Sequence, residues 1–242
     1  MTEELFLRDS YVKEFDARVQ KLAGRELILD RTAFYPGGGG QPPDKGALGV
    51  GPVRASVVDV RREAKPGGAG GEVVHVLDNP IPETVRDLRG ELDWERRYAH
   101  MRHHTALHVL SGVIWRTFQA KVTGGQMRTD RARMDFSFPG EWTTEIVGEI
   151  ERLTNEALAE GRPVKIYGLP REEAIKNPDL IRTQVNLLPE RVKTIRIVEI
   201  EGIDTQADGG THVANTREVG QMEITGHKSK GRQNKRIEFI LR

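Results

Sequence analysis

The chain has 242 residues, of which 37% are hydrophobic and 30% charged, and its formal net charge is +1. These values suit one large or two modest globular domains and exclude a polycationic nucleic-acid-coating protein, so any nucleic-acid binding must come from a local patch. The absence of cysteine excludes disulfide bonds and thiolate metal ligands. No apolar run could span a bilayer and the N-terminus is not a signal peptide, so we expect a cytoplasmic protein.

Residues 1–93 predict a small β-rich domain. Stretches with partly alternating apolar residues, such as residues 25–29 and 53–60, are typical of half-buried strands. Segments rich in glycine and proline separate them, a pattern that suggests a sandwich or, as we expect here, a small barrel. One such segment, residues 66–71, predicts a hairpin tip. Another, residues 36–43, is either a flexible turn or backbone that approaches a ligand closely.

A helix is predicted over residues 97–115. Its His104 and His108 are four residues apart and therefore project from the same face, where two imidazoles can form half of a transition-metal site. A metalloprotease helix needs Glu directly after the first of two such histidines, and Thr105 stands there instead, so the peptidase general base is missing. The opposite side of the helix carries an apolar stripe that should pack inward: Ala106, Val109, Leu110 and Val113.

The later elements follow from the same patterns. Met134, Phe136 and Phe138 alternate as in a strand, and residues 142–160 predict a second helix. The buried stripe expected on that helix consists of Ile146, Ile150, Leu153 and Ala157. Further predictions are a strand over 163–167, a short helix over 170–176, a strand over 193–200 and a closing hairpin formed by 218–225 and 236–241. The hairpin carries basic residues that usually form a solvated loop but could hold phosphates: His227, Lys228, Lys230, Arg232, Lys235 and Arg236.

A second pair of possible metal ligands, Asp208 and His212, lies between the last predicted strand and the hairpin. Gly209 and Gly210 allow the backbone between them to turn tightly, so that both side chains can face one point. With the two helical histidines they form three imidazoles and one carboxylate, a complete four-ligand set. We therefore expect one divalent ion per chain, with zinc as the first choice.

Several motifs together resemble one family. Residues 104–110 read HTALHVL and residues 208–220 read DGGTHVANTREVG, which resembles the editing domain of alanyl-tRNA synthetase and its free-standing AlaX relatives. Residues 34–41, FYPGGGGQ, are similar to the family's FYP-GGGQ loop, and residues 94–97, WERR, match the segment before the first histidine pair. The resemblance covers essentially the whole chain. Its one clear departure is Asp208, which stands where the family usually has Cys.

The resemblance implies an α+β editing domain over residues 94–242, which follows the barrel in the sequence. The implied reaction is hydrolysis of the ester that joins serine, or glycine, to the tRNA for alanine, a proofreading step in translation. The implied partner is that mischarged tRNA, with no membrane and no disulfide-linked partner. The metal, Zn²⁺ held by His104, His108, Asp208 and His212, would orient the substrate or lower the pKa of a bound water. The carboxylate ligand favours weaker zinc retention and admits manganese or iron more readily.

The same resemblance assigns substrate contacts. It places Gly38, Gly39, Gly40 and Gln41 at the editing pocket, and it matches Thr123 to a threonine that reads the hydroxyl of a misattached serine; the alternative is an ordinary strand threonine. Gln41 and Thr123 are thus the candidate catalytic residues. His100 and His103 fall outside the ligand pattern and are expected on the helix surface or facing the substrate.

Two other functions stay open. One is a related deacylase that acts on other aminoacyl esters. The other is a non-catalytic tRNA-binding module whose metal is structural. The chain has no nucleotide-binding motif and no room for an aminoacylation domain, so editing would occur in trans.

Overall fold

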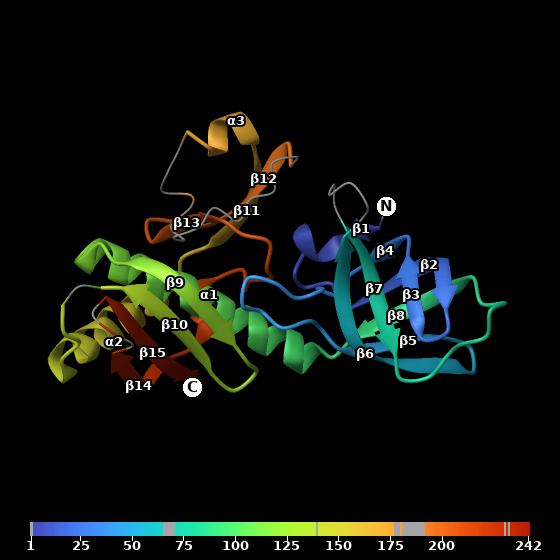
Figure 1. Ribbon diagram of the computed structural model, residues 1–242, viewed down its shortest axis with the longest axis horizontal. Coiled ribbons are helices and arrows are strands. Elements are labelled where there is room, and N and C mark those ends of the chain that lie inside the picture. Colours follow the sequence, from blue (N-terminus) through green and yellow to red (C-terminus); the bar gives the residue numbers. More distant parts are fainter. Residues whose placement is uncertain are drawn as a thin grey trace. The chain divides into compact units, whose positions relative to one another are not determined.

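The computed structural model describes residues 2–64, 71–138, 140–176, 180, 192–229, 231 and 233–242. The chain divides into two compact units, Met1–Tyr98 and Ala99–Arg242 (Figure 1). The domain boundary placed between residues 93 and 94 stays a prediction, because the helix that begins there, α1 (Trp94–Phe118), continues across the division between the units. Residues 66–70 of the predicted hairpin tip, and Lys230 and Arg232 of the hairpin, lie outside the described residues. No helix of the described ranges is long and apolar enough to cross a membrane.

The first unit contains the predicted small barrel. Six strands close it in the order β2-β3-β7-β6-β5-β8, and every neighbouring pair is antiparallel. These strands are β2 (Glu14–Ala23), β3 (Glu26–Leu29), β5 (Gly46–Val50), β6 (Val53–Ala64), β7 (Gly71–Leu77) and β8 (Asp87–Leu92). A short parallel pair and a 3-10 turn precede or flank them: β1 (Glu3–Glu4), β4 (Arg31–Thr32) and η1 (Leu5–Leu7). Closure leaves no free sheet edge in the barrel.

Apolar side chains, which alternate with polar ones along the strands, fill the barrel interior. In β2, Phe15 and Ala17 are buried while their neighbours are exposed, as a period of two requires when one face of a strand points inward. Fifteen buried residues form this core, and each large aliphatic side chain contributes roughly 1.5–3 kcal/mol by leaving water. His75 lies among them, fully buried, with its Nε2 2.8 Å from Thr32 Oγ1.

The second unit is built around α1, which contacts both of its sheets. Every residue from His103 to Ile114 is buried, so the expected inward stripe widens to the whole circumference of the helix. On one side the His103 ring stacks on Phe239 of the four-stranded sheet, with ring centroids 6.1 Å apart. On another side, Gly112 meets the turn of the three-stranded sheet, where an added Cβ would lie 2.6 Å from the carbonyl oxygen of Ile203. Glycine therefore lets the helix approach this turn closely.

The two sheets and the remaining helices give the predicted α+β architecture. The four-stranded sheet has the order β14-β15-β10-β9, and the three-stranded sheet has the order β11-β12-β13. Their strands are β9 (Lys121–Met127), β10 (Ala132–Ser137), β11 (Val164–Pro170), β12 (Thr194–Ile200), β13 (Asp204–Ala207), β14 (Met222–Ser229) and β15 (Asn234–Leu241). The helices are α2 (Thr144–Ala159), α3 (Arg171–Ala174) and the 3-10 turn η3 (Thr216–Val219).

Two predictions about this unit were wrong in detail. The buried stripe of α2 consists of Val147, Ile150, Thr154 and Leu158, so only Ile150 was placed correctly. Thr154 can lie inside because its hydroxyl donates to the carbonyl of Ile150 at 2.7 Å, which satisfies the polar group. The closing hairpin begins at Met222 rather than residue 218, because Asn215 and Glu218 form a capping box around η3.

Candidate metal centre

The four proposed ligands lie together in the second unit. His104 and His108 come from α1, Asp208 directly follows β13, and His212 lies four residues further along. One ligand atom from each residue lies within 4.8 Å of every other. Three of the four residues are buried and Asp208 is nearly so. The structure therefore brings together two pairs that are far apart in the sequence.

The arrangement of these side chains fits a small divalent cation. Oδ1 of Asp208 is 3.2 Å from Nε2 of His104, 3.4 Å from Nε2 of His212 and 3.8 Å from Nε2 of His108. A tetrahedral ion with bonds of about 2.0–2.1 Å has ligand atoms about 3.3 Å apart. The donor set of three imidazole nitrogens and one carboxylate oxygen thus has the spacing and the chemistry that such an ion requires.

Asp208 shapes the turn that carries it. Gly210 N donates to Oδ2 at 2.8 Å and, at the longer distance of 3.3 Å, to Oδ1, which is also the oxygen that faces the imidazoles. The carbonyl oxygen of Asp208 accepts from Nη1 of Arg196, on β12, at 2.8 Å. The sequence led us to expect a turn that needs the conformational freedom of glycine. Neither Gly209 nor Gly210 has a positive φ, however, so the turn does not use the left-handed conformation that favours glycine. It closes through the Asp208 side chain instead.

Two further residues support the histidines, and the sequence reasoning assigned them no such role. Asp204 at the start of β13 is buried, with Oδ2 2.8 Å from Nδ1 of His108. Thr105 places its Oγ1 3.2 Å from Nδ1 of His212. The role of Asp204 could have been found from the sequence. Asp204 and Asp208 are four residues apart in or next to a strand, so their side chains lie on the same face of it.

Burial and mutual contacts set the protonation of the cluster. Burial lowers the pKa of His104 well below its ordinary value and lowers that of His212 to about 4. Burial acts to raise the pKa of Asp208, but the charge of His104 and hydrogen bonds to two histidines outweigh it and hold this pKa well below the usual range. Burial likewise acts to lower the pKa of His108, but hydrogen bonds to Asp204 and Asp208 raise it to about 9. An ionised carboxylate and neutral imidazoles are the forms that bind metal, so a bound cation would have to displace the proton that the raised pKa leaves on His108.

The glycine loop of the first unit is a defined turn. Gly37, Gly38, Gly39 and Gly40 all have positive φ, from 57° to 131°, a region that glycine adopts without strain. Gly38 N donates to Gln41 O at 3.0 Å and Gln41 N donates to Gly38 O at 2.9 Å. Gln41 is buried. Contact of this loop with a substrate stays a prediction.

A buried ion pair anchors the end of this loop. Arg97 and Asp44 are both almost fully buried, and Nη2 of Arg97 lies 2.5 Å from Oδ2 of Asp44. Tyr35 N donates to the same carboxylate oxygen at 2.7 Å. Nη1 of Arg97 donates to Ser10 O at 2.9 Å, and Nη2 also donates to Ala33 O. One guanidinium therefore ties together three segments of the first unit.

The other residues singled out from the sequence lie elsewhere. Thr123 is exposed on β9, and its Oγ1 donates to Oδ1 of Asn234 at 3.1 Å, so its observed partner is not one of the four ligands. Its contact with serine stays a prediction. His100 and His103 are buried rather than on the helix surface. Nδ1 of His103 donates to Ala99 O at 2.9 Å, as burial of an imidazole requires.

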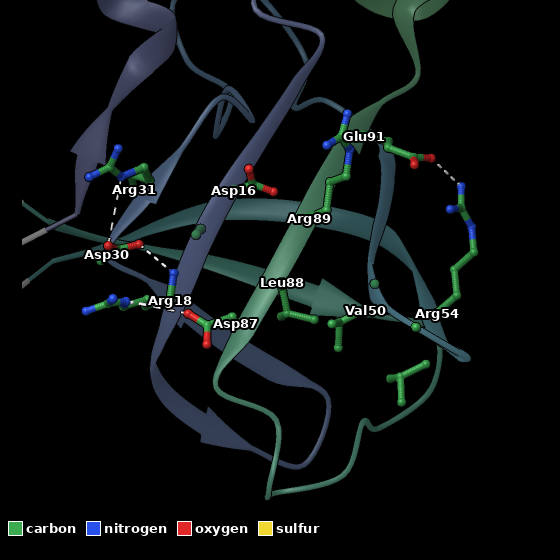
Figure 2. Close-up of a pocket in the computed structure, with 14 residues that line it drawn as sticks. Asp16, Arg18, Asp30, Arg31, Val50, Arg54, Asp87, Leu88, Arg89 and Glu91 are labelled. Carbon is green, nitrogen blue, oxygen red and sulfur yellow. Dashed lines mark hydrogen bonds and ion pairs between the residues drawn. The ribbon is translucent and has the colours of Figure 1, made fainter.

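A cavity of about 890 Å³ lies on the barrel (Figure 2). Four arginines and four carboxylates line it, together with apolar and glycine residues of β2, β5, β6 and β8 and of the turn between β5 and β6. Arg54 pairs with Glu91 at 2.7 Å and Arg18 with Asp87 at 3.5 Å. Because the positive and negative side chains balance, this cavity offers no net field for phosphates.

Two segments of the chain match known protein families, and these matches define the class of protein to which it is related. Residues 5–87 match the family described as tRNA synthetases class II (A), and residues 195–238 match the Threonyl and Alanyl tRNA synthetase second additional domain. Both halves of the chain are therefore related to parts of aminoacyl-tRNA synthetases.

Full-length relatives narrow this class. The chain is 41% identical to the alanyl-tRNA editing protein AlaX-M of Saccharolobus solfataricus, over 100% of both chains. It is 38% identical to the protein of the same name in Methanosarcina mazei, over 100% of this chain and 97% of that one. The alanine–tRNA ligase of Pyrococcus abyssi is 42% identical over 92% of this chain, which is 24% of the ligase. The chain belongs to the AlaX-M family of alanyl-tRNA editing proteins, which confirms the resemblance seen in its motifs.

Proposed function

We propose that this protein is a trans-editing deacylase, which hydrolyses the ester between serine, or glycine, and the tRNA for alanine. One observation carries the proposal: four side chains of types that can bind a metal converge within 4.8 Å in a chain whose full-length relatives are alanyl-tRNA editing proteins. Residues 94–242 carry the editing chemistry in this proposal. The reaction takes place in the cytoplasm, with the tRNA charged by the synthetase as substrate.

The metal in this proposal is Zn²⁺, one per chain, held by His104, His108, Asp208 and His212. When bound it would supply Lewis-acid chemistry, either orienting the ester or lowering the pKa of a water molecule. Asp208 contributes the negative charge of the ligand set, and its turn with Gly210 directs one oxygen to the site. The three histidines supply neutral nitrogen donors.

In this proposal the enzyme distinguishes seryl from alanyl esters by the hydroxyl group of serine. Seryl and alanyl esters differ by one hydroxyl group, and a pocket that hydrogen-bonds this group leaves its own polar partner unpaired when alanine enters. Thr123 is the proposed partner of the serine hydroxyl. Gly38, Gly39, Gly40 and Gln41 are the other residues proposed to contact the substrate. Their support is the family resemblance and the ordered, positive-φ turn that these residues form.

A deacylation assay tests the proposal. Purified protein is incubated with tRNA for alanine carrying serine, glycine or alanine, and with other mischarged tRNAs, and the remaining ester is measured over time. We expect hydrolysis of the seryl and glycyl esters and survival of the alanyl ester. The variant His212→Ala should lose both activity and stoichiometric zinc, whereas Glu145→Ala, which changes an exposed carboxylate of α2, should lose neither.

The alternatives give different results in the same assay. Turnover of another aminoacyl ester, with the seryl ester intact, would indicate a related deacylase. Binding of tRNA without turnover would indicate a binding module with a structural metal. Full activity after zinc is removed and its removal verified by elemental analysis would refute the role of the metal.

A further inference from the structure

Asp204 is a buried carboxylate that lies behind one of the proposed metal ligands. Its side chain is 0% exposed, and its Oδ2 is 2.8 Å from Nδ1 of His108. Gln206 donates to the same oxygen from Nε2 at 2.7 Å. We propose that Asp204 is a positioning residue of the metal centre, which fixes the ring of His108 and supplies the second negative charge that a buried divalent cation needs. This inference rests on the metal site of the proposed function.

The first part of the argument concerns the ring of His108. An ionised carboxylate can only accept a hydrogen bond, so the Nδ1 atom that faces Asp204 must carry a proton. The lone pair of the neutral ring is then on Nε2. This is the atom that faces Oδ1 of Asp208, at 3.8 Å. Asp204 therefore selects the tautomer and the orientation in which His108 can serve as a ligand.

The second part concerns charge. Three neutral imidazoles and Asp208 supply one negative charge to a cation of charge two, and the ligands are buried or nearly so. Arg196, which donates to the carbonyl of Asp208, adds a positive charge close by. An uncompensated charge in such an interior is costly. With Asp204, which is not itself a ligand, the two carboxylates match the charge of the divalent ion, and the nearby positive charge of Arg196 makes this second carboxylate more favourable still.

Thr105 provides an internal comparison. Its Oγ1 is 3.2 Å from Nδ1 of His212 and also accepts from Val213 N at 3.3 Å. A hydroxyl is neutral and can donate or accept, so it orients the ring without adding charge and without imposing one tautomer. If both the charge and the tautomer affect metal binding, removing the carboxylate behind His108 should lower zinc affinity more than removing the hydroxyl behind His212.

Zinc affinity of the intact protein tests the inference. The affinity is measured by competition with a chromophoric chelator for the wild type, Asp204→Asn, Thr105→Val and Glu201→Gln. Asp204→Asn keeps the size of the side chain and removes its charge, and we expect zinc affinity to fall 10–100-fold. Thr105→Val should cause a smaller loss. Glu201→Gln changes an exposed carboxylate that pairs with Lys165 near the same strand, and should leave zinc affinity unchanged.

The outcomes separate this inference from the metal site itself. A wild type that binds no zinc overturns both. A wild type that binds zinc, with Asp204→Asn within about twofold of it or with Thr105→Val more impaired than Asp204→Asn, overturns only the role of Asp204. If Asp204→Asn does not fold, the ring ¹⁵N chemical shifts of His108 in the zinc-loaded wild type decide. A protonated Nδ1 and a metal-bound Nε2 support the inference, and the reverse assignment overturns it.

Discussion

The substitution Arg97→Lys tests how the glycine loop is held. Lysine keeps the positive charge beside Asp44, but one ammonium group cannot reach the carboxylate and both carbonyl oxygens, of Ser10 and Ala33, that the guanidinium contacts. The variant therefore loses about two charge-assisted hydrogen bonds in a fully buried place. At about 1.5–3 kcal/mol each, the free energy of unfolding should fall by about 3 kcal/mol or more.

Urea unfolding of the full-length protein, followed by tryptophan fluorescence, measures this loss. The matched control is Arg96→Lys, because the neighbouring Arg96 is only part-buried and donates to a single acceptor, Pro43 O. The control should lose less than about 1 kcal/mol. A loss below that value for Arg97→Lys, or equal losses in the two variants, would refute the idea that this guanidinium anchors the loop.

Three further predictions concern His75, Asp208 and Thr123. Burial lowers the pKa of His75 to about 4 from 6.5, so the unfolded chain takes up this proton first as the pH falls. His75 alone should therefore lower the free energy of unfolding by about 2 kcal/mol between pH 8 and pH 5, and urea titrations of His75→Gln should lack this part of the slope. Asp208→Cys should slow zinc loss to a chelator because thiolate favours zinc, and faster loss would show that the bond to Gly210 N matters more. Thr123→Val should slow hydrolysis of the seryl ester about tenfold and leave the glycyl ester unchanged, whereas equal losses would mark Thr123 as structural.

The spacing of residues within one helix was enough to predict the first half of the metal site. His104 and His108 share a helix face whatever surrounds the helix, so their pairing could be read from the sequence. The meeting of this pair with Asp208 and His212 was inferred only because the chemistry of four ligands made it plausible. The barrel was likewise predicted from short alternating strands, since closure follows from many such strands with one buried face.

The remaining features depend on long-range packing, which a linear pattern does not show. Asp204 reaches His108 because α1 and the β12–β13 turn come into close contact at Gly112. Thr154 can replace an apolar residue in the stripe of α2 because its hydroxyl finds a carbonyl within its own helix. The turn after Asp208 looked like a glycine turn, but a side-chain hydrogen bond closes it. In each case a polar side chain found a partner that residue type alone does not reveal.

The position of Arg97 has a consequence for dividing the protein into fragments. This residue belongs to α1, yet its guanidinium is the partner of Asp44, which lies just before the barrel strand β5. A fragment that stops at residue 93 would leave the buried carboxylate of Asp44 without this guanidinium. A barrel fragment made for binding studies should therefore extend at least through Tyr98 and keep the first turn of the helix as part of the barrel.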